Sequence, residues 1–345
     1  MTQNQPIVEN RNVKNDSLLA QLVSDTRDSI ETKKRGLGIV PKGQKTSQTN
    51  HLKQLHKILI DPIADLLPTE PNARVIFIPQ SSLFLVPFPA LQDADGNYLI
   101  EKHTILTAPS IQVLDLTRKQ GQRVGAQSFA PSQGKNALIV GNPTMPSVPP
   151  FPGEPPQQLP SLPGAEQEAK SIAKLLNTQA ITGNQAAKSA ILKKMPSARI
   201  IHLATHGILD EQRGLGSAIA LAPNPNSQNK IGEVNGLLTA EEILDLKLNA
   251  SLVVLSACDT GRGRITGDGV VGLSRSLISA GVPSVLVSLW SVPDAPTAFL
   301  MTEFYRNWQH NPDKAQALRQ AMLTTMKQHP NPRDWAAFTL IGEAE

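Results

Sequence analysis

The sequence predicts an α/β protein built on a mostly parallel β-sheet with helices on both faces. The first observation is a pair of short apolar runs rich in branched residues, 200–204 and 252–255, each followed by a turn that contains glycine. Such runs are typical of strands buried on both faces. The second observation is that strand and helix patterns alternate from Gly164 onward, which favours a parallel sheet covered by its crossover helices.

Composition narrows the class of protein. The 345 residues can form one large or two ordinary domains. The net charge of +4 is spread without a basic block, which argues against nucleic acid as a partner. The single cysteine excludes an intrachain disulfide and a cysteine-based zinc site, and it suits a reducing compartment. No apolar run approaches the roughly 20 residues that span a bilayer. We therefore expect a cytoplasmic protein with no membrane contact, metal or cofactor.

The first 70 residues carry helical patterns. Residues 17–32 and 51–67 have apolar side chains at helical spacing, and Pro62 is expected to kink the second helix. Between them, residues 33–50 have few large apolar side chains and are expected to form a linker.

The remaining elements follow in order. Strands are expected at 74–78, 83–86, 98–100, 137–140, 180–181, 200–204, 252–255, 284–289 and 338–341, and helices at 110–119, 165–177, 185–194, 239–246, 269–280, 295–309 and 313–328. Thr239 and Glu242 form a capping-box pattern. The proline-rich stretch 146–163 must be an extended loop, and no 34-residue helical repeat is present.

Two residues at strand ends are candidates for catalysis. His206 precedes a glycine at the end of the first buried run, and Cys258, the only cysteine, follows the second. The crevice at the carboxyl ends of parallel strands is where α/β proteins bind ligands. Either residue alone could be structural, because free cysteines are commonly buried hydrophobes, and His202 is best interpreted as a core histidine. The separation of 52 residues nevertheless resembles the caspase arrangement.

A thiol and an imidazole together can cleave peptide bonds. A thiol with the usual pKa of about 8.5 is mostly protonated at neutral pH. A neighbouring imidazole can stabilise the thiolate as an ion pair, or accept the thiol proton, and then protonate the leaving amine. The oxyanion needs preorganised donors, for which the backbone N–H groups of Gly207 and Cys258 are candidates.

Several ordered motifs resemble those of the CHAT domain, a caspase- and separase-like group of cysteine peptidases (clan CD) often found after TPR repeats in bacteria, especially cyanobacteria. The motifs are LPGAE at 162–166, ATHG at 204–207, GLLTAEE at 236–242, SACDTG at 256–261, SLWSVPD at 288–294 and WAAFTLIG at 335–342. The resemblance covers about residues 70 to 343. It departs from the usual pattern in that no TPR array precedes the domain.

The resemblance implies a caspase-like fold, with His206 as general base and Cys258 as nucleophile. It also implies that the strand ending at Trp290 lines substrate pockets and that Asp294 recognises a basic P1 side chain. Asp294 is equally well interpreted as the N-cap of the following helix. Asp259 is a further candidate substrate contact, as is Asp268, which either borders the cleft or caps a helix.

The predicted organisation is a polar and helical N-terminal segment at 1–50, a helix with a pseudo-caspase-like subdomain at 51–160, and the peptidase domain at 161–345. The predicted function is a cysteine endopeptidase that cleaves selected proteins or itself, with Arg213 and Lys230 in the 210–236 loop as places for self-cleavage. The alternative is a catalytically silent CHAT-fold module that binds protein partners through the same cleft. Protein or peptide substrates, and a regulatory protein partner, are the expected partners.

Overall fold

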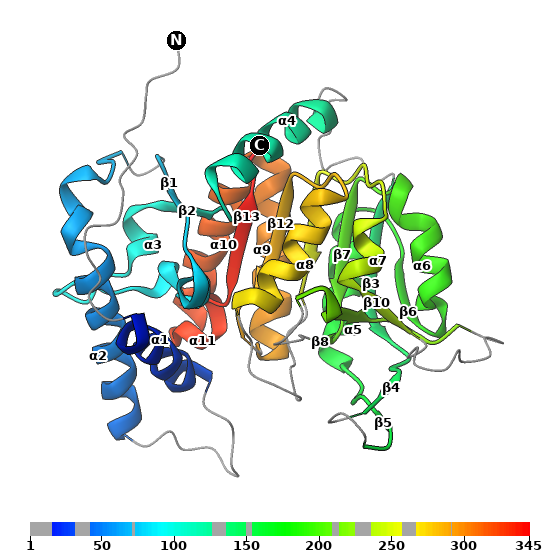
Figure 1. Ribbon diagram of the computed structural model, residues 1–345, viewed down its shortest axis with the longest axis horizontal. Helices are drawn as coiled ribbons and strands as arrows, with labels where there is room; N and C mark the ends of the chain where they lie inside the picture. Colours follow the sequence, from blue (N-terminus) through cyan, green and yellow to red (C-terminus); the bar gives the residue numbers. More distant parts are fainter. Residues whose placement is uncertain are drawn as a thin grey trace.

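The computed structural model describes residues 16–31, 42–70, 73–125, 136–149, 154–208, 214–224, 236–256, 267–290 and 292–345. Within these residues, eight strands form one sheet at the centre of the molecule (Figure 1). In spatial order they are β1 (Arg74–Phe77), β2 (Thr104–Thr107), β13 (Phe338–Gly342), β12 (Ser284–Ser288), β11 (Leu252–Leu255), β7 (Ile200–Ala204), β3 (Ala137–Pro143) and β6 (Ala180–Gly183).

Neighbouring strands of this sheet run parallel except for β12 and β13, which are antiparallel. The centre of the sheet is apolar: every residue of β7, β11 and β12 is buried. This is the burial that continuous runs of branched residues predict for parallel strands.

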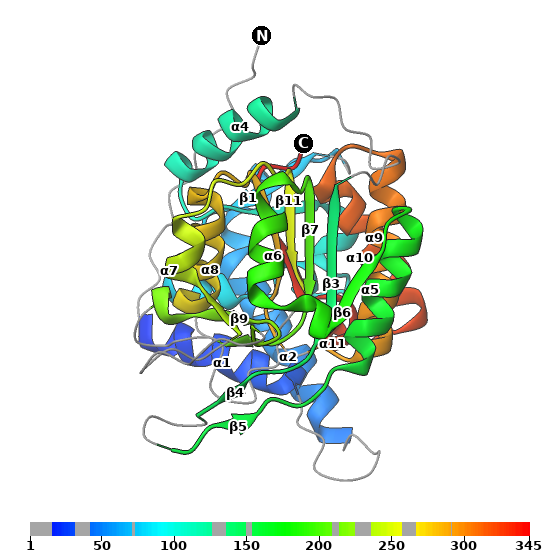
Figure 2. The same cartoon turned by 90° about the vertical axis from the view of Figure 1, so that its right-hand side faces the viewer.

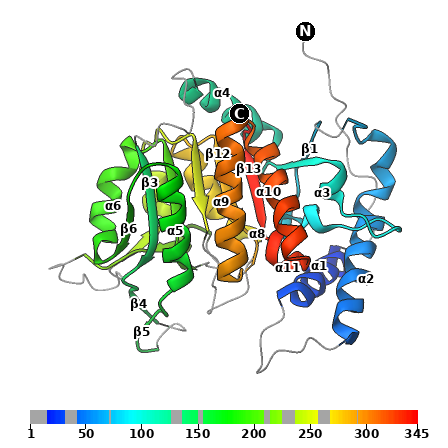
Figure 3. The same ribbon diagram turned by 180° about the vertical axis from the view of Figure 1, so that it is seen from behind.

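Helices cover both faces of the sheet (Figures 1 to 3). Figure 2 shows α6 (Lys188–Lys194), α7 (Ala240–Leu244) and α8 (Gly267–Ser279) on one face, and α5 (Pro163–Leu175), α9 (Asp294–His310) and α10 (Lys314–Gln328) on the other. The predicted α/β class, with a mostly parallel sheet between two helical layers, is confirmed.

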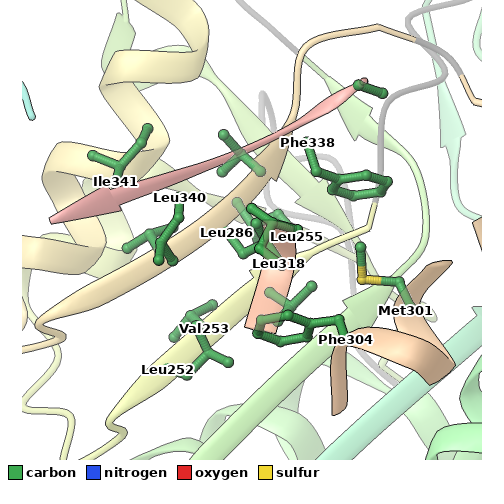
Figure 4. Close-up of a cluster of buried hydrophobic side chains, with 14 of the residues drawn as sticks. Leu252, Val253, Leu255, Leu286, Met301, Phe304, Leu318, Phe338, Leu340 and Ile341 are labelled. Atoms are coloured by element: carbon green, nitrogen blue, oxygen red, sulfur yellow. The ribbon is translucent and has the colours of Figure 1, made fainter. Parts of the chain in front are cut away.

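Figure 4 shows the apolar contacts that hold the sheet to the second layer. Met301 and Phe304 of α9 and Leu318 of α10 lie beneath Leu255 of β11 and Phe338 of β13, and each of the five is at most 4% exposed. Burying a side chain of this size stabilises a fold by roughly 1.5–3 kcal/mol. The contacts fix the central strands whose ends carry the candidate site.

The N-terminal helices α1 (Asp16–Glu31) and α2 (Lys42–Leu59) lie together at the β1 end of the sheet (Figure 1). α1 is fastened to the sheet by Arg27, which is 7% exposed and donates a hydrogen bond from Nη2 to the carbonyl oxygen of Leu289, 2.8 Å away. The segment just after β12 is therefore held from outside the sheet by a buried guanidinium.

Smaller elements complete the chain. There are three further α-helices: α3 (Leu99–Lys102), α4 (Ile111–Gly125) and α11 (Pro332–Trp335). The described residues also form the 3-10 helices η1 (Asp61–Leu66), η2 (Ser81–Leu85), η3 (Phe88–Ala90), η4 (Asn184–Ala186), η5 (Met195–Ser197) and η6 (Gly214–Gly216). Two small sheets contain β8 (Gly207–Ile208), β9 (Ala218–Ala220) and β10 (Leu237–Thr239), and β4 (Ser147–Val148) with β5 (Gln157–Gln158). No described helix has the length and hydropathy that crossing a bilayer requires.

Three local predictions are wrong. Residues 83–86 lie largely in η2 and 98–100 enter α3, so neither is a strand. Pro87 directly follows residues 83–86 and has no N–H to donate to a neighbouring strand. Residues 98–100 begin with a hydrogen bond from Tyr98 N to Glu101 Oε2, which caps the start of a helix. Helix α2 begins at Lys42, inside the stretch expected to be a linker. The division of the chain at residue 160 stays a prediction; β3, on the near side of that boundary, pairs with β6 and β7 on the far side.

Candidate active site

His206 follows the carboxyl end of β7 and is only 1% exposed. Its Nε2 lies 2.8 Å from the carbonyl oxygen of Pro160, in the loop before α5. A carbonyl oxygen can only accept, so Nε2 donates, and in a neutral imidazole Nδ1 is then the atom with the free lone pair. Nδ1 is buried and finds no hydrogen-bond partner among the described residues. The ring is thus oriented with its proton acceptor unused.

The neighbouring strand β11 leads toward Cys258. Cys258 and Asp259 lie outside the described residues, which reach Ser256 on this side. Ser256 is 7% exposed, and its Oγ is buried without a hydrogen-bond partner in the described part of the chain. β7 and β11 pair with a constant offset: Leu252 faces Ile200 and Leu255 faces Leu203, which is 52 residues in each case. The same number separates Cys258 from His206.

Gly207, the candidate oxyanion donor, is buried at the first position of β8 and faces Ile219 of β9. The carbonyl oxygen of His206 accepts a hydrogen bond from Ala220 N at 2.8 Å. The backbone on both sides of the imidazole is therefore fixed by a small sheet. Donation by Gly207 to an oxyanion stays a prediction.

The candidate substrate residues differ in accessibility. Trp290 is 0% exposed and its Nε1 donates to the carbonyl oxygen of Arg333 at 3.1 Å, so its side chain is packed in the core. Asp294 is exposed at the first position of α9. The N-cap is Pro293, and no side chain caps this helix, so the expected capping role of Asp294 is wrong. Asp268 is in the first turn of α8, but its side chain lies outside the described ones.

The segment 160–164 connects His206 with Asp294. At one end Pro160 accepts the hydrogen bond from His206, and at the other Gly164 packs against Asp294 so closely that a Cβ on Gly164 would lie 2.1 Å from the Asp294 Cγ. Glycine is thus required at 164 by the close approach of a carboxylate. His206 and Asp294, which are 88 positions apart in the chain (294 − 206), therefore contact the two ends of one five-residue segment.

His202 has the structural role expected from the sequence. It is fully buried in β7, with Nε2 3.0 Å from Glu168 Oε1 and Nδ1 3.2 Å from Tyr305 Oη. Burial raises the pKa of Tyr305 well above its usual value, and the nearby Glu168 raises it further. Both ring nitrogens are occupied, so His202 does not compete with His206 as a base.

Sequence reasoning missed the group that contacts His206 and the residue that holds the neighbouring loop. The carbonyl of Pro160 carries no sequence signal, because any residue supplies the same oxygen. Asn142, at the end of β3, does carry a weak sequence signal, because an asparagine between a glycine and a proline at a strand end indicates a turn. Among the described residues, no group of three or more His, Cys, Asp or Glu side chains is arranged to hold a metal ion.

Fold and site together define an α/β protein with a histidine centre at the carboxyl edge of a mostly parallel sheet. The chain belongs to the CHAT domain family, whose model matches residues 49–343, and the membership expected from the motifs is confirmed.

Two curated relatives are both named tetratricopeptide repeat protein 28. The mouse (Mus musculus) protein is 29% identical over 91% of this chain, and the human (Homo sapiens) protein is 28% identical over 94%. The chain spans only 14% of the length of each relative.

Two of the solved structures to which this chain is similar are the following. The separase–securin complex of Saccharomyces cerevisiae has a TM-score of 0.45 and 16% identity, over 88% of this chain and 17% of that one. The Arg-specific cysteine proteinase gingipain R has a TM-score of 0.47 and 11% identity, over 94% of this chain and 74% of that one.

Proposed function

We propose that this chain is a cysteine endopeptidase in which Cys258 is the nucleophile and His206 the general base. The observation that carries the proposal is the register of β7 and β11. The register ends at Leu203 and Leu255, and His206 and Cys258 each follow that pair by three residues, so we infer that the two residues leave neighbouring strands at the same level. Paired positions on neighbouring strands are about 5 Å apart, which is within reach of a thiol–imidazole contact.

The state of His206 suits this role. Its Nε2–H is engaged by Pro160, so the free Nδ1 takes the thiol proton while the sulfur attacks the scissile carbonyl carbon. The imidazolium then gives that proton to the leaving amine as the C–N bond breaks, which leaves a thioester on Cys258. Water, deprotonated by the same Nδ1, hydrolyses the thioester, and the released thiolate recovers its proton. The N–H groups of Gly207 and Cys258 are the proposed oxyanion donors, each worth roughly a hundredfold in rate.

We also propose that Asp294 selects a basic P1 residue. Its carboxylate is exposed, beside the start of α5 that also contacts His206 through Pro160. An exposed carboxylate can pair with the guanidinium of an arginine side chain through two hydrogen bonds. Substrates would be proteins or peptides with an accessible Arg or Lys. Arg213 and Lys230 lie outside the described residues, and cleavage of the chain itself there is part of the same proposal.

The test is covalent labelling with an acyloxymethyl ketone peptide carrying Arg at P1, measured by intact mass. Wild-type protein is expected to gain one label, Cys258→Ala and His206→Gln none, and His310→Gln, an exposed histidine on α9, the wild-type amount. Asp294→Asn should slow labelling by the Arg probe about tenfold and leave a Leu probe unaffected. Labelling that persists in Cys258→Ala would refute the nucleophile. An unlabelled wild-type protein that still binds peptides would favour the silent binding module.

A further inference from the structure

Asn142 occupies an uncommon backbone conformation at the carboxyl end of β3, next to β7. Its φ is +45°, in the left-handed region that asparagine tolerates better than most residues. The side chain is partly buried and uses both ends of its amide. Oδ1 accepts hydrogen bonds from Leu162 N at 2.8 Å and Ser161 Oγ at 3.1 Å, and Nδ2 donates to Glu166 Oε2 at 3.1 Å.

These contacts fix the chain immediately after Pro160, at Ser161 and Leu162. The residue before Pro160, Leu159, is buried, and its N–H donates to the carbonyl oxygen of Pro146 at 3.1 Å. Pro160 itself is exposed and has no N–H, so the position of its carbonyl depends on these two anchors. Asn142 is the anchor on the side of α5.

We propose that Asn142 is a positioning residue for His206: it fixes the Pro160 carbonyl, which in turn keeps the proton of His206 on Nε2 and leaves Nδ1 free to act as base. As a positioning role in catalysis, this rests on the proposed function; as a statement about the tautomer of His206, it can be tested without any activity. The left-handed conformation matters because it directs the amide from the end of one strand across to the start of α5. Asparagine supplies both the conformation and the acceptor.

The test uses Asn142→Gly, which relieves the backbone but removes the amide. Its matched control is Asn177→Gly, the same change at another left-handed asparagine (φ +52°), just beyond the other end of α5. The readout is a two-dimensional ¹⁵N–¹H spectrum of the imidazoles at about pH 8.5, where histidine is ordinarily neutral. The His206 signals are assigned by their loss in His206→Gln.

Wild type and Asn177→Gly are expected to show His206 as the Nε2–H tautomer in about tenfold excess, the factor that one well-formed hydrogen bond supplies. In Asn142→Gly the excess of the Nε2–H tautomer should fall several-fold. Asn142→Asp keeps the oxygen that accepts from Leu162 and Ser161 and tolerates the same φ, but it loses the hydrogen bond to Glu166, so it should restore only part of the excess. An unchanged ratio in Asn142→Gly, or no recovery in Asn142→Asp, would overturn the proposal.

A milder variant keeps the test decisive if Asn142→Gly does not fold. Glu166→Ala removes the acceptor of Nδ2, and Lys170→Ala removes the other partner of Glu166 without touching Asn142. Glu166→Ala should shift the tautomer ratio of His206 part of the way, and Lys170→Ala should leave it unchanged. The same ratio in both variants would also refute the positioning role of Asn142. A tautomer shift without Cys258-dependent labelling would leave this inference standing while the peptidase proposal fails.

Discussion

Lys314 offers a quantitative test of the energetics of this fold. It is 2% exposed at the start of α10, its Nζ is 3.5 Å from the carbonyl oxygen of Ala344, and it lies 5.7 Å from the ring centre of Trp308. No carboxylate lies within ion-pair distance of its Nζ in the described part of the chain. Burial lowers the pKa of Lys314 from 10.5 to about 8, against an opposing effect of nearby carboxylates.

The difference between 10.5 and about 8 corresponds to about 3 kcal/mol in the free energy of unfolding. Below pH 8 both the folded and unfolded chains carry the proton, so the full cost of burying the charge is present. Between pH 8 and 10.5 the folded chain releases the proton first, and stability rises with pH. Lys314→Met removes this cost together with a cation–π contact worth about 1 kcal/mol, so the variant should be about 2 kcal/mol more stable than wild type at pH 7.

The assay is urea unfolding at pH 7 and pH 10.5, followed by tryptophan fluorescence. The advantage of Lys314→Met should disappear at the higher pH. Lys119→Met, at a position where the side chain is 71% exposed, is the control and should differ from wild type by less than about 0.5 kcal/mol at both values. The reasoning fails if Lys314→Met is destabilised at pH 7, or if its difference from wild type does not depend on pH.

Two further predictions concern buried polar contacts. Glu168→Ala leaves the Nε2 of His202 buried without its partner and should lower the free energy of unfolding by about 1–3 kcal/mol, measured from the urea midpoint; a change below 0.5 kcal/mol would contradict the network. Arg27→Met removes the charged hydrogen bond to the Leu289 carbonyl and should cost about 1.5–3 kcal/mol, whereas a variant as stable as wild type would show that α1 is held by apolar contacts alone.

Much of the sheet could be predicted because its central strands are apolar on both faces. Residues 200–204 and 252–255 match β7 and β11 in their bounds, and the capping box of Thr239 and Glu242 is present at the start of α7. β2 was missed: its four residues have no alternation and no long apolar run. It is buried between β1 and β13 and beneath α10, and β13 and α10 are more than 200 residues away, which local pattern cannot reveal.

The candidate site could likewise be predicted from the sequence only in part. The strand ends of His206 and Cys258 could be located from sequence, because glycine-containing turns follow apolar runs. The contact of His206 with Pro160 could not, since it depends on how a proline-rich loop folds back over β7. The proximity of Gly164 and Asp294 was equally hidden, because it arises only when α5 and α9 pack side by side.

The placement of β13 has a consequence for synthesis of the chain. This strand, made by residues 338–342, lies between β2 and β12, and Thr107 Oγ1 reaches across to the carbonyl oxygen of Leu340 at 3.1 Å. While the ribosome still covers these residues, β2 and β12 each present an open edge, and β1 with β2 has no sheet to join. Unpaired edges invite pairing with other chains. A nascent chain therefore keeps the edges of β2 and β12 open to pairing with other chains until residues 338–342 emerge and fill the gap between them.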